Sequence, residues 1–377
     1  KEHNTLLRAR AKGLGLKMNE YGVYAAAPRG GEQPLPLADE EAVYRSLGLP
    51  WIPPELREGE EELEAAEAGR LPQLLQAGQI KGMIHAHSSY SDGLAGIEEL
   101  ARECRRLGYE YLCLSDHSRS AGYAGGLSIE RLREQRREID EVNARLRPFR
   151  VFAGVESDIL ADGGLDYPPE VLAELDFVIG SVHANLTMPP AAATERLLAA
   201  VRHPALTILG HVSGALLLSR PGYEYDEERL FTALAEAEVV LEHNCNPHRL
   251  DPDWPVLKRA GRRGIRVALC PDAHGLGDLT YMRFGLTMAR KAWLEPGGVL
   301  NCLGVEEIDA FFKARRGRGR GHGQGRPTRA RTARGRDRPP VGRGRSGRAT
   351  PSGLPQPLRA AGGHDPGRAV HRRDGQQ

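Results

Sequence analysis

The sequence predicts an α/β protein whose main part is a distorted seven-stranded (βα) barrel. Two observations lead to this fold: apolar, β-rich runs alternate with helical stretches between residues 79 and 314, and there are seven such runs. Repeated βα units favour a parallel sheet, and seven strands favour its closure into a barrel. An open, doubly wound sheet is the alternative, although no glycine-rich phosphate fingerprint follows the first strand.

The strands and helices of this barrel are expected to alternate along the chain. Strands are predicted at 82–87, 109–116, 151–156, 177–183, 206–211, 239–244 and 265–270. Helices are predicted at 97–107, 128–146, 191–203, 226–237, 255–263 and 279–292.

A small α+β region, residues 1–57, is expected before the barrel. Its pattern predicts a helix over 5–11, a short strand over 17–24 and a second helix that begins after Asp39 as N-cap. The region is too short to hold a core alone. Residues 58–78 are acidic and alanine-rich, which is typical of a linker with helical character.

Charge is distributed unevenly along the chain. The formal net charge is +2, but residues 315–377 hold 17 Arg and 3 Asp, a net of +14. Residues 1–314 hold 35 basic and 47 acidic residues, a net of −12. An acidic body that attracts cations favours metal binding over broad electrostatic binding of nucleic acid.

The segment 315–377 is an Arg/Gly-rich, low-complexity tail that is expected to be disordered. One interpretation is non-specific nucleic-acid binding. The other, which we favour, is an out-of-frame reading of a GC-rich gene, since the tail holds no Lys and the barrel pattern stops before it.

The cysteines and the hydropathy pattern predict a location. The five cysteines are odd in number and form no CxxC pair, which favours a reducing cytoplasm over a disulfide framework or cysteine-bound zinc. No signal peptide and no apolar run of membrane-spanning length is evident. A soluble cytoplasmic protein without a membrane partner is expected.

The eight residues HAHSSYSD, from His85 to Asp92, carry the strongest chemical signal. Side chains alternate along a strand, so His85 and His87 are expected on one face, with Asp92 in the Ser/Gly loop that follows. Two imidazoles and a carboxylate suit Zn, Fe or Mn ions. The segment therefore predicts the start of a metal site.

Ligand-type side chains also stand at the ends of the other predicted strands. Six of the ten histidines before residue 315 fall there together with three carboxylates: His85, His87, Asp92, His117, Glu156, His183, His211, Asp272 and His274. The carboxyl ends of barrel strands form the rim on which barrel enzymes build their sites. Nine ligands exceed the needs of one ion, so two or three divalent ions that share a bridging carboxylate are predicted.

The order of these motifs resembles the PHP (polymerase and histidinol phosphatase) superfamily. The motifs HAH…SD, SDH, GVE, SVH, GH and DAH cover residues 79–312 and resemble the C-terminal PHP domain of bacterial family X DNA polymerases. The strings KEHNTLLRARAKGLGLKMNEYGVY and EEAVYRSLGLPWIPPELREG resemble the end of that family's polymerase thumb. The resemblance implies a seven-stranded distorted barrel, 3′–5′ exonuclease and end-processing activity in base excision repair, and DNA as the partner.

The same resemblance does not extend to polymerisation. The family's nucleotidyl-transfer carboxylates lie upstream of the thumb, and Asp39 is the only aspartate in the first 80 residues. No Asp-x-Asp pair for two-metal phosphoryl transfer is therefore available there. We expect residues 1–57 to be a remnant of the thumb, and the chain not to polymerise DNA.

The resemblance also implies how the ions, usually manganese or zinc and sometimes iron, are held. One ion would be bound by His85, His87, Glu156 and Asp272, with Glu156 bridging; a second would be completed by His183 and His211, and a third by Asp92, His117 and His274.

The expected chemistry follows from such a cluster, which lowers the pKa of a bridging water and stabilises charge on phosphate. Glu156, Asp272 and His274 are the expected catalytic residues, and Asp272 or His274 could orient the nucleophile. Arg119 and Arg249 follow strand ends and could clamp phosphate, with an ordinary surface ion pair as the alternative.

Four other polar residues are given lesser roles. Asp116 is expected to orient its neighbours. His243 and His248 are expected to be structural or to face the substrate, and His203 to end a helix.

Three functions remain open. The first is a metal-dependent nuclease or phosphoesterase that acts on DNA ends. The second is a histidinol-phosphatase-like enzyme with a small substrate, against which the thumb-like residues 1–57 argue. The third is an inactive, metal-stabilised module, against which the complete ligand set argues.

Overall fold

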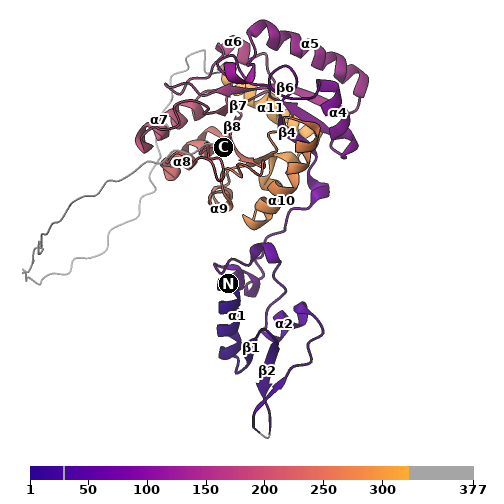
Figure 1. Ribbon diagram of the computed structural model, residues 1–377, viewed down its shortest axis with the longest axis vertical. Helices are drawn as coiled ribbons and strands as arrows, with labels where there is room; N and C mark the ends of the chain where they lie inside the picture. Colours follow the sequence, from indigo (N-terminus) through magenta and orange to yellow (C-terminus); the bar gives the residue numbers. More distant parts are fainter. Residues whose placement is uncertain (29, 322–377) are drawn as a thin grey trace, which may run out of the picture. The chain divides into compact units, whose positions relative to one another are not determined.

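The computed structural model describes residues 1–28 and 30–321. They contain a three-stranded antiparallel sheet near the N-terminus and a seven-stranded parallel sheet with the order β10-β9-β8-β7-β6-β5-β4 (Figure 1). Among these residues, no helix has the length and apolar character needed to cross a membrane. The part of the predicted tail from residue 322 onward lies outside the described residues.

The large sheet confirms all seven predicted strands. They are β4 Gly82–Ala86, β5 Tyr111–Leu114, β6 Arg150–Asp158, β7 Phe177–Ser181, β8 Ile208–Leu209, β9 Val240–Asn244 and β10 Val267–Cys270. Each strand pairs in parallel with its neighbours. The two edge strands also meet: the amide of His87, just after β4, donates to the carbonyl of Ala273, just after β10, at 2.8 Å. The sheet therefore closes into a nearly complete barrel.

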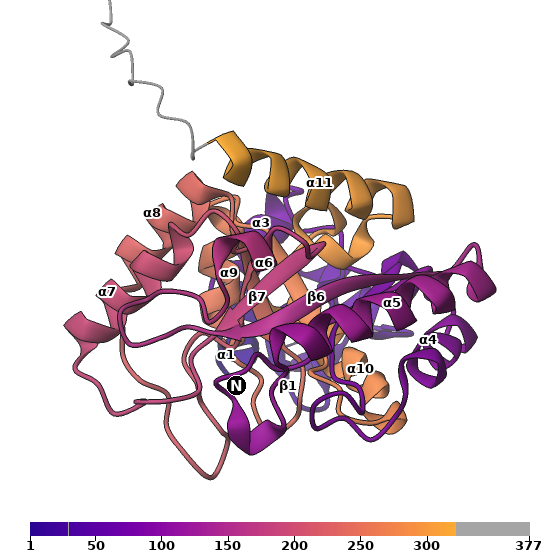
Figure 2. The same cartoon turned by 90° about the horizontal axis from the view of Figure 1, so that it is seen from above.

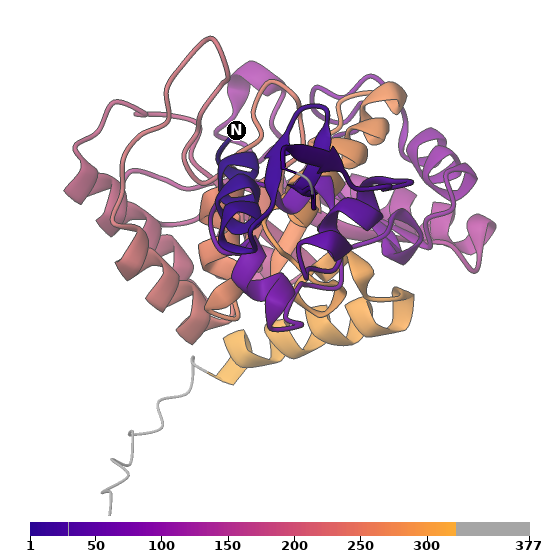
Figure 3. The ribbon, with the colours of Figure 1, turned by 90° about the horizontal axis from the view of Figure 1, so that it is seen from below.

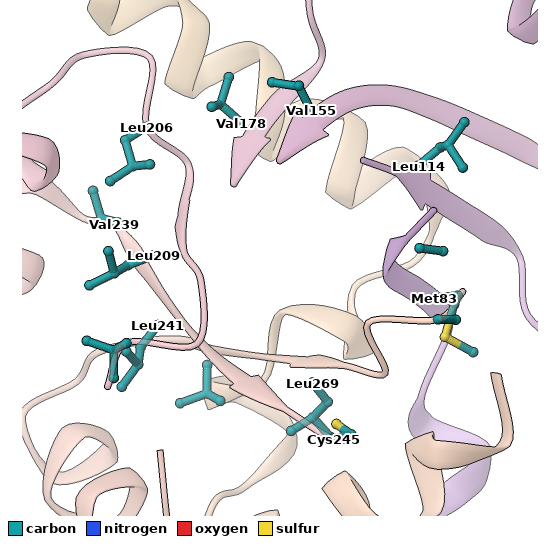
Figure 4. Close-up of a cluster of buried hydrophobic side chains, with 14 of the residues drawn as sticks. Met83, Leu114, Val155, Val178, Leu206, Leu209, Val239, Leu241, Cys245 and Leu269 are labelled. Carbon is teal, nitrogen blue, oxygen red and sulfur yellow. The ribbon is translucent and has the colours of Figure 1, made fainter. Parts of the chain in front are cut away.

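Helices cover the outside of the barrel (Figure 1). They are α4 Ile97–Arg106, α5 Ile129–Leu146, α6 Pro169–Leu172, α7 Pro190–Val201, α8 Glu227–Ala237, α9 Trp254–Arg262 and α10 Met282–Lys291. Ser128, Asp226 and Asp253 cap three of them, because each side chain accepts a hydrogen bond from a first-turn amide. Outward-facing strand residues such as Met83, Val155 and Leu241 belong to the core that these helices cover (Figure 4).

The inside of the barrel is a second apolar core at the amino ends of the strands. It contains Ile84, Phe152, Phe177 and further inward-facing residues of the seven strands. Helix α11 (Val305–Gly321) lies on the opposite side of the strands from the long βα loops (Figure 2, Figure 3). Its Phe312 ring lies 5.4 Å from the Phe152 ring and 5.2 Å from the Phe177 ring, so α11 closes this end.

Helix α11 also corrects part of the prediction for the tail. The sequence predicted a disordered tail from Arg315, whereas α11 continues through Arg315 and Arg316 to Gly321. The reason is specific pairing: the Arg315 guanidinium donates to the Leu206 carbonyl, and Arg316 pairs with Asp176 at 2.8 Å. These two arginines therefore belong to the barrel.

The N-terminal region contains α1 (Glu2–Gly13), β1 (Lys17–Asn19), β2 (Gly22–Ala26), β3 (Glu32–Pro34) and α2 (Glu40–Ser46). The single strand predicted over 17–24 is instead the hairpin β1–β2. Its turn forms because the Asn19 side chain accepts from the Tyr21 and Gly22 amides, and Gly22 takes a φ of 149°. Its buried cluster around Leu7, Tyr44 and Ile52 is completed by Ala66 and Leu74, so the region shares its core with residues 58–78.

Residues 58–78, predicted as a linker, are attached to the barrel helices. Helix α3 (Glu62–Glu67) confirms the expected helical character. Lys258 of α9 pairs with Glu60 at 2.7 Å, and the Gln73 amide donates to Glu295 at 2.8 Å. These contacts hold the segment against the barrel rather than leaving it as a free spacer.

Candidate metal centre

The carboxyl rim of the barrel brings all nine predicted ligands together. His85 and Glu156 belong to β4 and β6, and the others stand in the loops directly after their strands. Each of the nine has a ligand-type atom within 3.9 Å of such an atom of another. The arrangement that the sequence predicted from strand ends is therefore present as one compact cluster.

His85 reaches this cluster in a way that simple alternation along a strand did not predict. The β4–β5 register shifts between Ile84 and Ala86, and His85 has a φ of +70°, so a β-bulge lies at this position. Ile84 packs in the inner core and Ala86 in the outer one. Without the bulge, alternation from Ile84 would place His85 on the outer face with Met83. The extra residue turns it inward beside His87.

Glu156 lies at the centre of the site and is buried. Its Oε1 lies 3.0 Å from His211 Nε2, 3.3 Å from His183 Nε2 and 3.5 Å from His85 Nε2. Its Oε2 lies 3.0 Å from His117 Nδ1 and 3.7 Å from His87 Nε2. A carboxylate with imidazoles around both oxygens has the geometry of a bridging ligand.

Among the described residues, the ligand-type atoms at the rim form four overlapping groups, and within each group they lie within 4.8 Å of one another. The groups are His87, Asp92, His117 and His274; His85, His87 and Asp272; His117, Glu156 and His183; and His85, Glu242 and Cys270. The family resemblance assigned His87 and His117 to one ion each, whereas here each belongs to two groups.

The unsatisfied atoms of the site fit divalent cations. His85 Nε2, His87 Nδ1, His117 Nδ1 and Glu156 Oε2 are buried and accept or donate no hydrogen bond. Buried polar atoms without a partner are costly, and imidazole nitrogens and carboxylate oxygens are ligands for Zn, Mn and Fe. The residues present therefore suit the predicted metal cluster.

The two deepest carboxylates are held in their charged form. Burial works to raise the pKa of Glu156, but positive charge on His183 and His85 lowers it well below its usual value. Burial opposes ionisation of Asp272 in the same way, and the charge on His85 again lowers its pKa well below the usual value. The centre is thus anionic in itself and requires positive charge.

Histidines supply that positive charge when no cation is bound. Burial would lower the pKa of His183, but Glu156 raises it to about 10. The Asp92 carboxylate likewise raises the pKa of His274 to about 9 against the effect of burial. His87 differs, because burial lowers its pKa to about 4. A divalent cation would replace the protons on the first two rings.

The sequence prediction missed one buried carboxylate that hydrogen-bonds to two of the candidate ligand residues. Glu242, near the end of β9, accepts from His85 Nδ1 at 2.7 Å and from the His211 amide at 3.2 Å. Asn244 donates to Glu242 at 3.1 Å and to Asp272 at 3.0 Å. The available signal was a glutamate inside the apolar run VVLEHN at a predicted strand end.

Asp158 is a second partner that the sequence prediction missed. It extends β6 two residues beyond Glu156, and its Oδ1 lies 2.5 Å from His183 Nδ1. Such a contact fixes which imidazole nitrogen faces the centre, because the other nitrogen is engaged by a carboxylate.

Asp116 holds the HAHSSYSD loop, as predicted. It accepts from the Ser88 amide at 2.8 Å and the Ser88 hydroxyl at 2.6 Å, and also from the Ser91 hydroxyl and from Gln135. These bonds position the loop that carries Asp92.

The two predicted phosphate-binding arginines lie in different environments. Arg119 is half exposed and pairs with Asp166 at 3.2 Å, which is the ion pair considered as its alternative role. Arg249 lies mostly buried beside the centre, with Nε 3.6 Å from Asp272 Oδ2. Its Nη1 is buried without a hydrogen-bond partner, so it is the better placed of the two to meet an anion.

The histidines outside the cluster have structural or peripheral positions. His243 is buried, with Nδ1 2.9 Å from the Pro252 carbonyl. His203 follows α7 and accepts from the Ala205 amide at 3.2 Å. His248 is exposed in the loop after β9. None of the three belongs to the groups of ligand atoms found among the described residues.

Comparison with known families agrees with this geometry. Residues 84–245 match the PHP domain family, and residues 1–58 match the DNA polymerase beta thumb family. The chain therefore carries a PHP domain preceded by a polymerase thumb. The order of the two matches agrees with the predicted resemblance to bacterial family X DNA polymerases.

Two kinds of curated protein are similar to the chain. The chain is 40% identical over 313 residues to the DNA polymerase/3′-5′ exonuclease PolX of Bacillus subtilis, an alignment of 83% of this chain and 54% of that protein. The chain thus spans about half the length of this relative. A probable phosphatase of Thermoanaerobacter sp. is 26% identical over 250 residues, which are 62% of this chain and 94% of that protein.

One solved structure aligns with part of this chain. The histidinol phosphate phosphatase of Lactococcus lactis, complexed with zinc, L-histidinol and phosphate, aligns with 57% of this chain and 95% of its own, at 20% identity and a TM-score of 0.42.

Proposed function

We propose that the barrel is a metal-dependent phosphoesterase that removes nucleotides from the 3′ ends of DNA. The observation that carries the proposal is the bridging geometry of Glu156, whose two oxygens are surrounded by the imidazoles of His85, His117, His183 and His211. Two or three bound Mn²⁺ or Zn²⁺ ions, or Fe²⁺, would supply hydroxide near neutral pH and neutralise charge on the phosphate.

The protein's own side chains have distinct tasks in this proposal. Arg249, with a free buried Nη1 beside Asp272, binds a non-bridging phosphate oxygen. Asp272 orients the nucleophile in the buried part of the site. His274 is one-third exposed and contacts Asp92 at 3.4 Å, so it stands where a proton can pass between the site and solvent.

DNA is proposed as the substrate because of the domain context. Residues 1–57 form a thumb, 58–78 connect it to the barrel, and residues 79 onward carry the catalytic site. The relative from Bacillus subtilis that shares both regions is named as a polymerase and 3′-5′ exonuclease. A role in DNA repair in the cytoplasm accords with this combination.

A small-molecule phosphatase is the second candidate. The observation in its favour is that a probable phosphatase aligns over 94% of its own length with only 62% of this chain, at 26% identity. A purely structural module is disfavoured, because all nine ligand-type residues are present and in mutual reach.

The test is cleavage of 3′-labelled and 5′-labelled DNA by the full chain with Mn²⁺, with a histidinol phosphate assay in parallel. Stepwise shortening from the 3′ end supports the nuclease. Phosphate release from the small ester with intact DNA would move the function to a phosphatase. Bound metal without either activity would favour the structural module.

Matched histidine variants make this test specific. His85→Ala removes a buried ring of the cluster, whereas His203→Ala removes a ring at the end of α7. The proposal requires that only the first abolishes DNA shortening. Equal activity of the two variants would refute the assignment of the site.

A further inference from the structure

The rim around the metal centre carries exposed apolar side chains that belong neither to the hydrophobic core nor to the candidate metal ligands. Within the barrel residues that the structure describes, seven large apolar side chains are exposed. Six of them lie in the βα loops of the carboxyl rim: Leu94, Tyr123, Leu160, Leu217, Leu218 and Leu276. Apolar groups gathered around a site mark a surface that binds a partly apolar ligand.

Tyr123 is the member of this set nearest to the ligands. It lies in the short helical turn Gly122–Ala124 after β5, and its side chain is 73% exposed. Its ring centroid lies 6.2 Å from that of His117 and 6.4 Å from that of His183. The ring therefore presents a free face to solvent at the edge of the cluster.

The backbone holds Tyr123 in this exposed position. The flanking side chains of Ala121 and Ala124 are buried, and the Ala121 amide donates to the Ser118 carbonyl at 3.0 Å. The Leu127 amide donates to the His117 carbonyl at 2.9 Å, which ties the far end of the loop to a ligand residue. An ordered loop that presents an aromatic ring loses little entropy on binding.

The chemistry of the neighbouring groups defines the ligand. The cluster and Arg249 suit an anionic phosphate, and Tyr123 beside them suits a flat ring. A nucleotide joins these two groups through one sugar. A histidinol-like ester offers a smaller, cationic body, to which the ring of exposed leucines is not complementary.

We propose that Tyr123 is the platform on which the unstacked 3′-terminal base of a DNA strand stacks while its phosphate lies at the metal centre. The inference rests on the proposed nuclease function and adds its preferred substrate, an unpaired or frayed 3′ end. Leu218, in the loop between β8 and α8, is a further exposed apolar side chain of the same rim.

The experiment compares two single-stranded oligonucleotides with the full, Mn²⁺-loaded chain. One ends in a normal 3′ nucleotide and the other in a 3′ nucleotide without a base. Stacking on an aromatic ring accounts for roughly 5- to 150-fold in affinity. The intact protein should therefore have a KM for the normal end lower than for the baseless end by a factor within that range.

Three variants locate this preference. Tyr123→Ala should raise KM for the normal end to that of the baseless end. Tyr123→Phe should keep the preference, since the ring remains. Leu107→Ala, a change at an exposed leucine away from the rim, should also keep it.

The outcomes separate the two proposals. If the intact protein shortens DNA but Tyr123→Ala keeps the full preference, or slows both substrates equally, the platform is wrong and the nuclease stands. If the intact protein shortens neither oligonucleotide and hydrolyses histidinol phosphate, the nuclease is wrong and the platform is refuted with it.

Discussion

The two ends of the barrel are made from the same seven strands but serve opposite purposes. At the amino end, the inward residues are apolar, and Phe152, Phe177 and Phe312 fill the interior. At the carboxyl end, the inward residues are charged, and His85 and Asp272 adopt positive φ angles of 70° and 52°. Such conformations persist only where surrounding structure enforces them. The apolar end supplies the stability that allows the strained, charged end to exist.

Removal of a ligand should give the largest effect, confined to activity. Asp272→Ala removes a buried carboxylate that contacts His85 and His87. Mutation of a residue that only supports a metal ligand typically reduces metal affinity or activity by about 10–100-fold. Loss of the ligand itself should therefore reduce kcat/KM for DNA by more than this. Asp162→Ala, at an exposed aspartate on the same rim, is the control. Equal losses of kcat/KM in the two variants would show that activity depends on the rim in general and not on the ligand cluster.

Removal of an apolar side chain at the other end should act on stability instead. Phe312→Ala deletes a buried ring that contacts two others and should reduce the free energy of unfolding by about 3–5 kcal/mol. Urea unfolding measures this, and metal content by mass spectrometry should stay unchanged. Phe311→Ala, at the half-buried neighbouring ring, should cost less. Loss of metal from Phe312→Ala would show that the two ends are coupled.

Glu242 tests the boundary between the two ends, because it is buried beneath the ligands. Glu242→Gln keeps the side-chain volume but removes the negative charge beside His85 Nδ1. We expect a loss of about 10–100-fold in metal affinity, measured by competition with a chelator. Glu236→Gln, at an exposed position of α8, should change nothing. Unchanged affinity in Glu242→Gln would make this carboxylate a purely structural group.

The sequence predicted the barrel well because parallel strands buried on both faces leave a strong, repeated signal. It predicted that the nine ligand-type residues cluster, because their positions follow strand ends. It could not predict the bulge at His85, since the register shift depends on β5 and not on the residues of β4 alone. It also missed Glu242, whose role exists only through the contact with His85, 157 positions away.

Helix α11 was missed for a related reason. Its last turns are rich in Arg and Gly, which locally favour disorder. Tertiary contacts override this preference, because Arg315 and Arg316 find carbonyl and carboxylate partners on the barrel. Local composition alone cannot report such partners.

The pH dependence of metal binding distinguishes the charged end from an ordinary surface. The pKa of His183 is raised to about 10 and that of His274 to about 9, so both rings are protonated at pH 7 without metal. A cation must displace these protons, and its affinity should therefore rise as pH increases from 6 to 9, by about tenfold per pH unit for each proton displaced. Isothermal titration in buffers of different ionisation enthalpy counts the released protons. His183→Gln should release one proton fewer, whereas His203→Gln should release the same number as the unaltered chain. Affinity that is flat across this range would mean that carboxylates alone hold the ions.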